Sequence, residues 1–239
     1  MTDNPKSVGA EAVAGEIMGS NQAVPLPPLR VAINSAAIVK SGSSAVESLS
    51  ALRNYLVAQH INFGRRALAV CAPHTDAGCT YVASNLALSC AQAGINTLLI
   101  DGNMRDPQID QIFTPDRPVA GLCEFLKSEE DEPPFLAANI RPGLSVIYAN
   151  SAGEAASDLL AGQRLKTLIN ESVRSFDLTI IDCPPSAHYG DARRIASLLR
   201  YAVVVARRDH SFAAHVKTLV NELKSDGVSV VGTFLNIID

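Results

Sequence analysis

Short apolar runs that alternate with helical patterns constrain the fold of this chain more than any other feature of its sequence. Such runs, rich in aliphatic and β-branched residues, are typical of strands buried on both faces of a parallel sheet. They lie at 67–72, 96–101, 143–149, 176–182, 201–206 and 228–236. Helical patterns lie between them, at 84–94, 163–175, 191–199 and 212–225. The alternation predicts an α/β fold, in which helices cover both faces of a mostly parallel sheet in three α/β/α layers.

The length of 239 residues fits one domain with a tail. Residues 1–44 show no sustained hydrophobic period and predict a flexible N-terminal arm, so we expect the folded domain to cover 45–239. Within the arm, the segment PLPPLR at 25–30 is typical of a linker, and docking through a polyproline turn is the alternative interpretation. Leucines at three- and four-residue spacing predict an amphipathic helix at 46–59.

Composition argues against several classes of function. The net charge of −4, without a block of like charges, predicts no nucleic-acid partner. No apolar stretch approaches the roughly 18 residues of a membrane-spanning helix, and the acidic residues near the N-terminus do not fit a signal peptide. We therefore expect a cytoplasmic protein. The 5 cysteines are scattered without a CxxC pair, so neither a disulfide framework nor a zinc site is predicted.

The loop APHTDAGCT at 72–80 lies between the first predicted strand and its helix, where a phosphate-binding loop would lie. A working loop, GxxxxGK[ST], uses glycines to bring backbone N–H groups to the phosphates, a lysine to reach the β and γ groups, and a hydroxyl to hold Mg²⁺. Gly78 and Thr80 match, but Cys79 stands in place of the lysine and Asp76 in place of an upstream glycine. The thiol removes a cation, and the carboxylate adds repulsion on the order of 1–4 kcal/mol. An ordinary strand-to-helix turn is the alternative interpretation.

Two further loops begin with an acid at the end of a predicted strand. Asp101 ends LLID and Asp182 ends TIID. Alone, either residue could equally be a solvated loop residue or a helix cap. Because ligands of parallel sheets bind beyond the carboxyl ends of the strands, the three loops are expected to converge. Together they indicate a site descended from a magnesium–nucleotide site.

Several segments resemble the cytoplasmic domain of bacterial tyrosine autokinases of capsule and exopolysaccharide synthesis. That family lies within the deviant P-loop ATPase group of chromosome-partitioning and septum-site proteins. The shared segments are SNLA, LLID, MRDP and IIDCPP, in the family's order and spacing, and the resemblance covers about 46–239. The resemblance implies a P-loop NTPase-like fold for this range.

Carried over by position, the resemblance implies roles for single residues. Thr80 and Asp182 fall where the family holds Mg²⁺, and Asp101, Asn103 and Arg105 fall in the second loop. The second carboxylate of the family's DxD is the neutral Asn103, whose amide cannot act as a base.

The resemblance also implies features that this chain lacks. The family's C-terminal tyrosine cluster has no counterpart after Tyr201, and His74 stands where partitioning proteins have an extra lysine. These differences predict a catalytically degenerate member with vestigial second-loop residues. It is expected to need no cofactor, or to bind ATP or ADP with Mg²⁺ weakly.

The resemblance also implies partners. In the helix at 46–59, the family's ring-forming pattern ExxRxxR is reduced to Glu47 and Arg53, because Ser50 stands at the middle arginine. These residues mark an interaction surface and leave a homo-oligomer open. The expected partner is a membrane-spanning polysaccharide chain-length or co-polymerase protein, which would bring the chain to the inner face of the cell membrane.

Three hypotheses follow for function. The first is a regulatory or scaffold protein of polysaccharide synthesis and export. The second is a residual ATP-binding tyrosine kinase or nucleotide switch, in which Arg105, Arg53 or another cation replaces the lysine. The third is a reactive thiol at Cys79, favoured by the N-terminus of a helix and opposed by the nearby Asp76.

Overall fold

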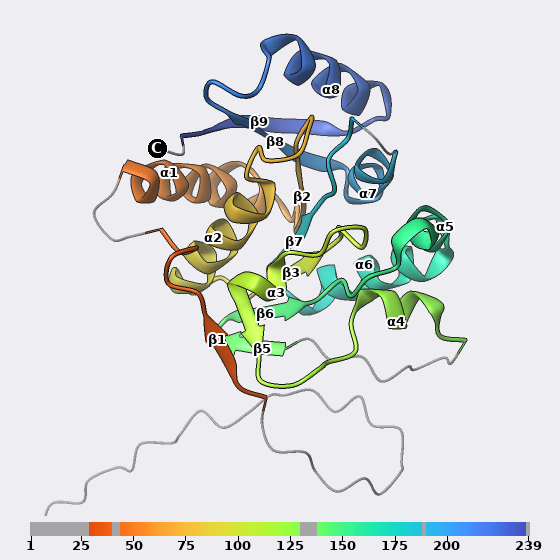
Figure 1. Cartoon of the computed structure of the whole chain (residues 1–239). Helices are drawn as coiled ribbons and strands as arrows, with labels where there is room; N and C mark the ends of the chain where they lie inside the picture. Colours follow the sequence, from red (N-terminus) through yellow and green to blue (C-terminus); the bar gives the residue numbers. More distant parts are fainter. Residues whose placement is uncertain (1–28, 40–43, 130–137, 188–189, 238–239) are drawn as a thin grey trace, which may run out of the picture.

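The computed structural model describes residues 29–39, 44–129, 138–187 and 190–237. A seven-stranded sheet with the order β5-β6-β3-β7-β2-β8-β9 forms its centre (Figure 1). Neighbouring strands are parallel except β5 and β6, which are antiparallel, so the predicted mostly parallel sheet is confirmed. The strands are β2 (Ala67–Cys71), β3 (Thr97–Asp101), β5 (Ala138–Arg141), β6 (Leu144–Ile147), β7 (Leu178–Asp182), β8 (Tyr201–Arg207) and β9 (Ser229–Asn236).

Helices cover both faces of the sheet, as the predicted α/β/α layering requires. Helices α1, α2 and α3 pack against one face, and α4 to α8 pack against the other (Figure 1). Their bounds are α1 (Ser44–Gln59), α2 (Cys79–Gln92), α3 (Ile109–Ile112), α4 (Leu122–Lys127), α5 (Ala156–Ala161), α6 (Gln163–Ser175), α7 (Asp191–Leu199) and α8 (Ala213–Ser225). Short 3₁₀ turns lie at Ile61–Phe63 and Gly153–Ala155. In the part of the chain that the structure describes, no helix has the length and apolar character to cross a membrane.

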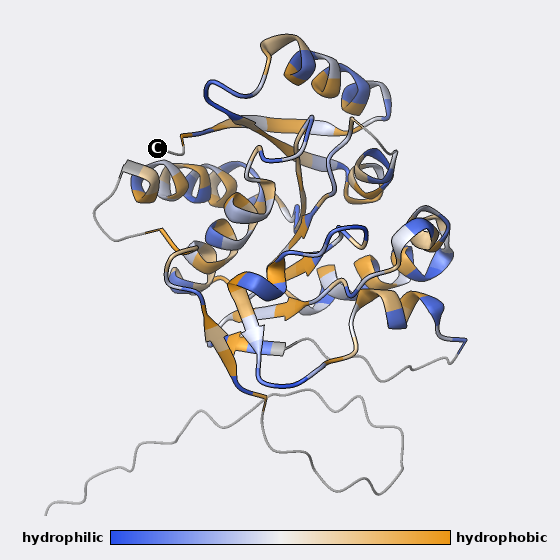
Figure 2. Ribbon diagram, in the orientation of Figure 1, coloured by the Kyte–Doolittle hydropathy of each residue, from blue (hydrophilic) through white to orange (hydrophobic). Residues whose placement is uncertain are grey.

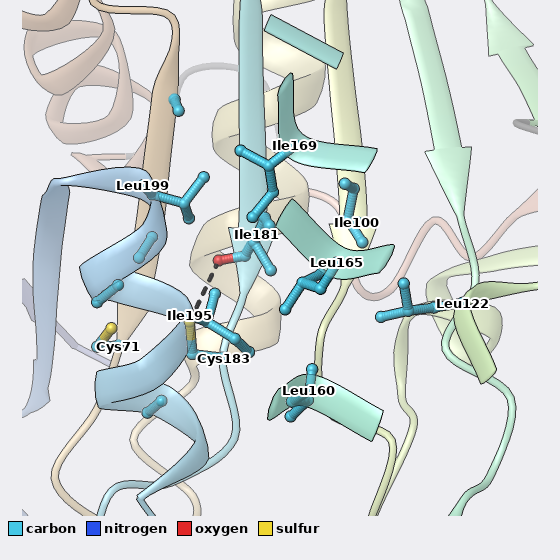
Figure 3. Close-up of a cluster of buried hydrophobic side chains, with 14 of the residues drawn as sticks. Cys71, Ile100, Leu122, Leu160, Leu165, Ile169, Ile181, Cys183, Ile195 and Leu199 are labelled. Atoms are coloured by element: carbon cyan, nitrogen blue, oxygen red, sulfur yellow. Dashed lines mark hydrogen bonds between the residues drawn. The ribbon is translucent and has the colours of Figure 1, made fainter. Parts of the chain in front are cut away.

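Continuous apolar runs form the middle of the sheet because these strands are covered on both sides. Every residue of β2, β3 and β7 is buried, and hydrophobic colours concentrate on the central strands (Figure 2). Figure 3 shows part of one core, in which Ile181 of β7 lies near Ile195 and Leu199 of α7. Two hydrophobic cores therefore hold the strand ends at the carboxyl edge in fixed positions.

The beginning of the described chain differs from the sequence prediction. Strand β1 (Val31–Ile33) pairs antiparallel with β4 (Phe113–Pro115) in a small second sheet. The backbone N–H of Val39 donates to Asn85 Oδ1 of α2 at 2.8 Å. Residues 29–39 thus pack on the domain. The sequence did not predict this, because the paired strands are too short to show a hydrophobic period and lie far apart in the chain. Residues 1–28 and 40–43, which include most of PLPPLR, lie outside the described residues, and the flexible arm stays a prediction there.

Candidate functional site

The first loop joins β2 to α2 and turns through two left-handed residues. Gly78 has φ +83° and caps α2, which suits glycine because it has no Cβ. Asp76 has φ +59°, a conformation that costs an ordinary L-residue roughly 1–2 kcal/mol. The position that matches a glycine in the resembled family therefore keeps the backbone conformation of a glycine.

The thiol of Cys79 points into the protein rather than toward solvent. Its Sγ donates to the carbonyl oxygen of Val70 in β2 at 3.0 Å. Burial, and then the charge of Asp182, raise the pKa of this thiol well above its usual range. The hypothesis of a reactive thiolate is therefore wrong, because the neutral hydrogen-bonded form is the stable one.

Thr80 and Asp182 meet as the matching of motifs predicts. Thr80 Oγ1 donates to Asp182 Oδ2 at 2.6 Å. Asp182 Oδ1 is buried and has no hydrogen-bond partner among the described residues. A hydroxyl and a carboxylate with a spare oxygen are donors that suit Mg²⁺, which usually takes its other ligands from water and phosphate. Within the described ranges, no group of three His, Cys, Asp or Glu side chains could hold a metal ion by itself.

Asp101 shapes the second loop from its base. Its Oδ1 accepts the backbone N–H of Asn103 at 2.9 Å, and its Oδ2 accepts those of Gln108 and Ile109, each at 3.2 Å. Asp101 and Asp182 are register partners at the ends of β3 and β7. Burial and the neighbouring Asp182 raise the pKa of Asp101 to about 8. Burial raises the pKa of Asp182 to about 6.

Gly102 allows the two acids to lie on adjacent strand ends. Its N–H donates to the carbonyl oxygen of Asp182 at 2.9 Å. A Cβ at this position would stand 2.7 Å from that oxygen and 2.9 Å from Ile181 Cγ2. The loop beyond it turns where Asn103 Oδ1 accepts the N–H of Asp106 at 3.3 Å. Asn103 therefore has a local structural role in this loop.

A cavity of about 580 Å³ collects these residues at the carboxyl edge of the sheet. Its lining brings together most of the predicted site: Asp76, Gly78, Cys79, Thr80, Asn103 and Arg105. Asp101 and Asp182 lie beneath it, almost fully buried. A larger cavity of about 750 Å³ lies along β4 and reaches Asp101 but is lined by no residue of the first loop.

One basic side chain that lines the 580 Å³ cavity, Arg207, was missed by sequence reasoning. Arg207, the last residue of β8, donates from Nη1 to the carbonyl oxygen of Asp76 at 3.2 Å. The rings of His74 and His210 meet edge to face with centroids 4.8 Å apart. Because β8 lies beside β2, a cation at the end of β8 lies near the first loop. That neighbourhood depends on strand order, which no local pattern reveals.

The two residues of the expected interaction surface lie on α1 and outside the cavity. Arg53 Nη1 donates to Ser89 Oγ of α2 at 3.0 Å, and Arg53 Nε donates to Asn54 Oδ1. Arg53 thus joins α1 to α2 and does not line the cavity that would need a replacement cation. Glu47 is exposed.

The fold and the site together define a P-loop NTPase-like α/β domain, and comparison with solved structures agrees. The kinase domain of the Escherichia coli tyrosine kinase ETK superposes with a TM-score of 0.74 at 28% identity, over 82% of this chain and 77% of that one. The cell-division ATPase MinD of Pyrococcus furiosus shares the fold, with a TM-score of 0.62 at 20% identity over 72% of each chain.

Curated relatives give the narrower relationship. The tyrosine-protein kinase ptk of Acinetobacter johnsonii is 27% identical over 200 residues, which cover 84% of this chain and 27% of that protein. The succinoglycan biosynthesis transport protein ExoP of Rhizobium meliloti is 29% identical over 177 residues, 73% of this chain and 22% of that protein. No family model matches the chain. Its homologues are bacterial tyrosine-protein kinase domains. The chain spans about a quarter of the length of ptk and of ExoP.

Proposed function

We propose that this chain is a catalytically degenerate relative of the tyrosine autokinases, and that it acts as a regulatory or scaffold component of exopolysaccharide or capsule synthesis and export. The observation that carries the proposal is the side chain at position 79. A lysine there would extend toward bound phosphates, whereas the Cys79 thiol is neutral and hydrogen-bonded to Val70 inside the protein. The proposed pathway is supported by a relative named for succinoglycan biosynthesis, ExoP, and by relatives named as tyrosine-protein kinases.

The charges around the cavity support the proposal that polyphosphate binds there only weakly. Phosphoryl transfer depends mainly on positioning and on cations that neutralise the phosphates. Asp76 lines the cavity and Asp182 lies below it. The two arginines in the lining, Arg105 and Arg207, already donate to protein oxygens. Asn103 cannot take a proton from an attacking hydroxyl.

Nucleotide and magnesium are therefore not required for the proposed role. If Mg²⁺ enters, Thr80 and Asp182 are the residues that would hold it, since Asp182 Oδ1 is buried without a partner. Bound there, the ion would neutralise phosphate charge. Asp101 is occupied by three backbone N–H groups and serves the loop.

Function as a scaffold requires partners. The partner we propose is a membrane-spanning chain-length or co-polymerase protein, which would place this domain at the inner face of the cell membrane. A second copy of the chain is the other candidate, docked through α1. There the exposed Glu47 is available, and Arg53 holds the helix against α2.

A residual nucleotide-binding kinase or switch is the second candidate function. The observation in its favour is that the cavity of about 580 Å³ keeps Gly78 and Thr80 and gains Arg207 at its rim. In that case Arg207 would leave the Asp76 carbonyl and replace the missing lysine.

Calorimetric titration with ATP and with ADP, each with Mg²⁺, separates the two candidates. We expect no binding by the wild-type chain up to millimolar nucleotide. Asp76→Gly with Cys79→Lys should raise the affinity by roughly 100-fold, since each charge change near phosphate is worth about a factor of ten or more. Asp76→Gly with Cys79→Ser is the matched control, which removes the carboxylate without adding the cation. Micromolar binding by the wild type would refute the scaffold proposal and favour the nucleotide switch.

A further inference from the structure

The guanidinium of Arg105 is held by a closed set of side chains from two helices. Arg105 Nε donates to Asp191 Oδ2 at 2.9 Å, and Arg105 Nη2 donates to Ser157 Oγ at 2.7 Å. Ser157 Oγ in turn donates to Asp191 Oδ1 at 2.7 Å. Both carboxylate oxygens of Asp191 are used, and only 3% of its side chain is exposed. The Asp191 end of this ion pair is therefore buried, while 17% of the Arg105 side chain is exposed.

This network connects the second loop to the opposite side of the site. Arg105 lies in the loop after β3, Ser157 lies on α5, and Asp191 is the first residue of α7. A carboxylate at the N-terminus of a helix is favoured by the helix dipole. Arg105 also lines the 580 Å³ cavity together with Thr80. Arg105 thus lies beside the first loop, while its Nε and Nη2 groups donate to side chains of α7 and α5.

We propose that Asp191 is a positioning residue that turns Arg105 away from the phosphate loop, and that this contact sets how strongly the cavity binds anions. The inference rests on the proposed function, because it accounts for weak polyphosphate binding in a cavity that still has an arginine in its lining. Hydrogen bonds between charged groups are strong and directional. Donors held by a carboxylate, a hydroxyl and the carbonyl oxygen of Gly153 offer little to a ligand.

The two ends of the ion pair are not equivalent as targets for mutation. Removing the guanidinium would leave the Asp191 carboxylate buried without its counter-ion, which is strongly destabilising. Asp191→Asn keeps the shape of the side chain and one acceptor oxygen, which Ser157 can still use. It removes the charge that holds Arg105, so the arginine is the group that gains freedom.

The test is calorimetric titration of the full chain with inorganic pyrophosphate and with ATP, each with Mg²⁺. We expect Asp191→Asn to raise the affinity for both probes by roughly tenfold, the effect of one cation near phosphate. The gain should disappear in Asp191→Asn with Arg105→Gln, and added salt should weaken the binding by the single variant Asp191→Asn. Ser157→Ala, which leaves the ion pair charged, should give a smaller gain and serves if Asp191→Asn fails to fold.

Asp226→Asn is the matched control for loss of a negative charge. Asp226, just after α8, pairs at 2.7 Å with Arg193, which lies on the same helix as Asp191. Asp226 does not line the 580 Å³ cavity, so we expect no gain in affinity. A folded Asp191→Asn variant that binds no better than the wild type would overturn the proposal. So would a gain that persists when Arg105 is replaced by glutamine.

Failure of the proposed function would look different from failure of this inference. Micromolar ATP binding by the wild type would refute the scaffold role. The double variant Asp191→Asn with Arg105→Gln, which leaves no buried carboxylate without a counter-ion, then decides. Affinity equal to that of the wild type supports the positioning role of Asp191, and a large loss shows that Arg105 already contacts the nucleotide.

Discussion

Replacing Gly102 with alanine tests the close approach of β3 and β7 beneath the cavity. The new Cβ would stand 2.7 Å from the Asp182 carbonyl oxygen, 2.9 Å from Ile181 Cγ2 and 3.0 Å from Ile195 Cδ1. Two of these atoms belong to β7 and its backbone is fixed by neighbours on both sides, so the strand ends must separate. Forcing a methyl group into a packed site costs typically about 1–3 kcal/mol.

The unfolded state offsets part of this cost. Alanine restricts the unfolded chain more than glycine does, which stabilises the folded state by about 0.4–1 kcal/mol. We therefore expect Gly102→Ala to lower the free energy of unfolding by about 1–2 kcal/mol. In a domain of this size that corresponds to a fall in the melting temperature of roughly 2–8 °C. Urea unfolding at constant pH, followed by circular dichroism, measures the difference.

Gly232→Ala provides the control within the same sheet. Gly232 lies in β9, and a Cβ there would meet no atom within 4 Å. Only the effect on the unfolded chain remains, so this variant should be as stable as the wild type or slightly more stable. Equal stability of the two alanine variants would refute the close packing of the two strand ends.

Two further predictions concern the titrating groups of the site. The pKa values of Asp101 and Asp182 are raised to about 8 and about 6, so between about pH 4 and pH 8 the folded chain holds protons that the unfolded chain has released. The free energy of unfolding should fall as pH rises through this window, by about 1.4 kcal/mol per pH unit where the folded and unfolded chains differ by one bound proton. Urea unfolding measures this fall, and Asp182→Asn should make it less steep. Stability that increases with pH in the wild type would contradict the raised pKa values. Iodoacetamide at pH 8 should alkylate Cys79 much more slowly in the folded chain than in urea, because burial and Asp182 disfavour the thiolate. Peptide mass spectrometry measures the two rates, and equal rates would place the thiol in solvent.

The sheet could be predicted because buried parallel strands need continuous apolar runs, which a sequence displays directly. The small sheet of β1 and β4 could not, since its strands Val31–Ile33 and Phe113–Pro115 are too short to show a period. The start of α2 at Cys79 was missed for a similar reason. The residues of its first turn have the composition of a loop. The left-handed Gly78 before it, together with packing on β2, defines where the helix begins.

The site could be predicted where a motif fixes the backbone and not where distant segments meet. Thr80 and Asp182 were matched by motif, and they do meet. The contact between Arg105 and Asp191 joins residues 86 positions apart, and Arg207 reaches the phosphate loop only through the order of the strands. The sequence did not predict the direction of the Cys79 thiol, because the electrostatics of a helix terminus favours a thiolate while burial next to Asp182 opposes it more strongly.

Retained motif residues in this site have structural reasons to be there apart from catalysis. Asp101 accepts three backbone N–H groups of the second loop, and a loop deprived of them would leave buried donors unpaired at about 1–3 kcal/mol each. Asp182 takes the Thr80 hydroxyl and so joins α2 to β7. Position 79 contributes one side-chain contact, from the Cys79 thiol to the Val70 carbonyl oxygen, and the loops have this shape with no lysine there. Matching LLID and TIID therefore identifies the fold, whereas the chemistry depends on the residues that line the cavity.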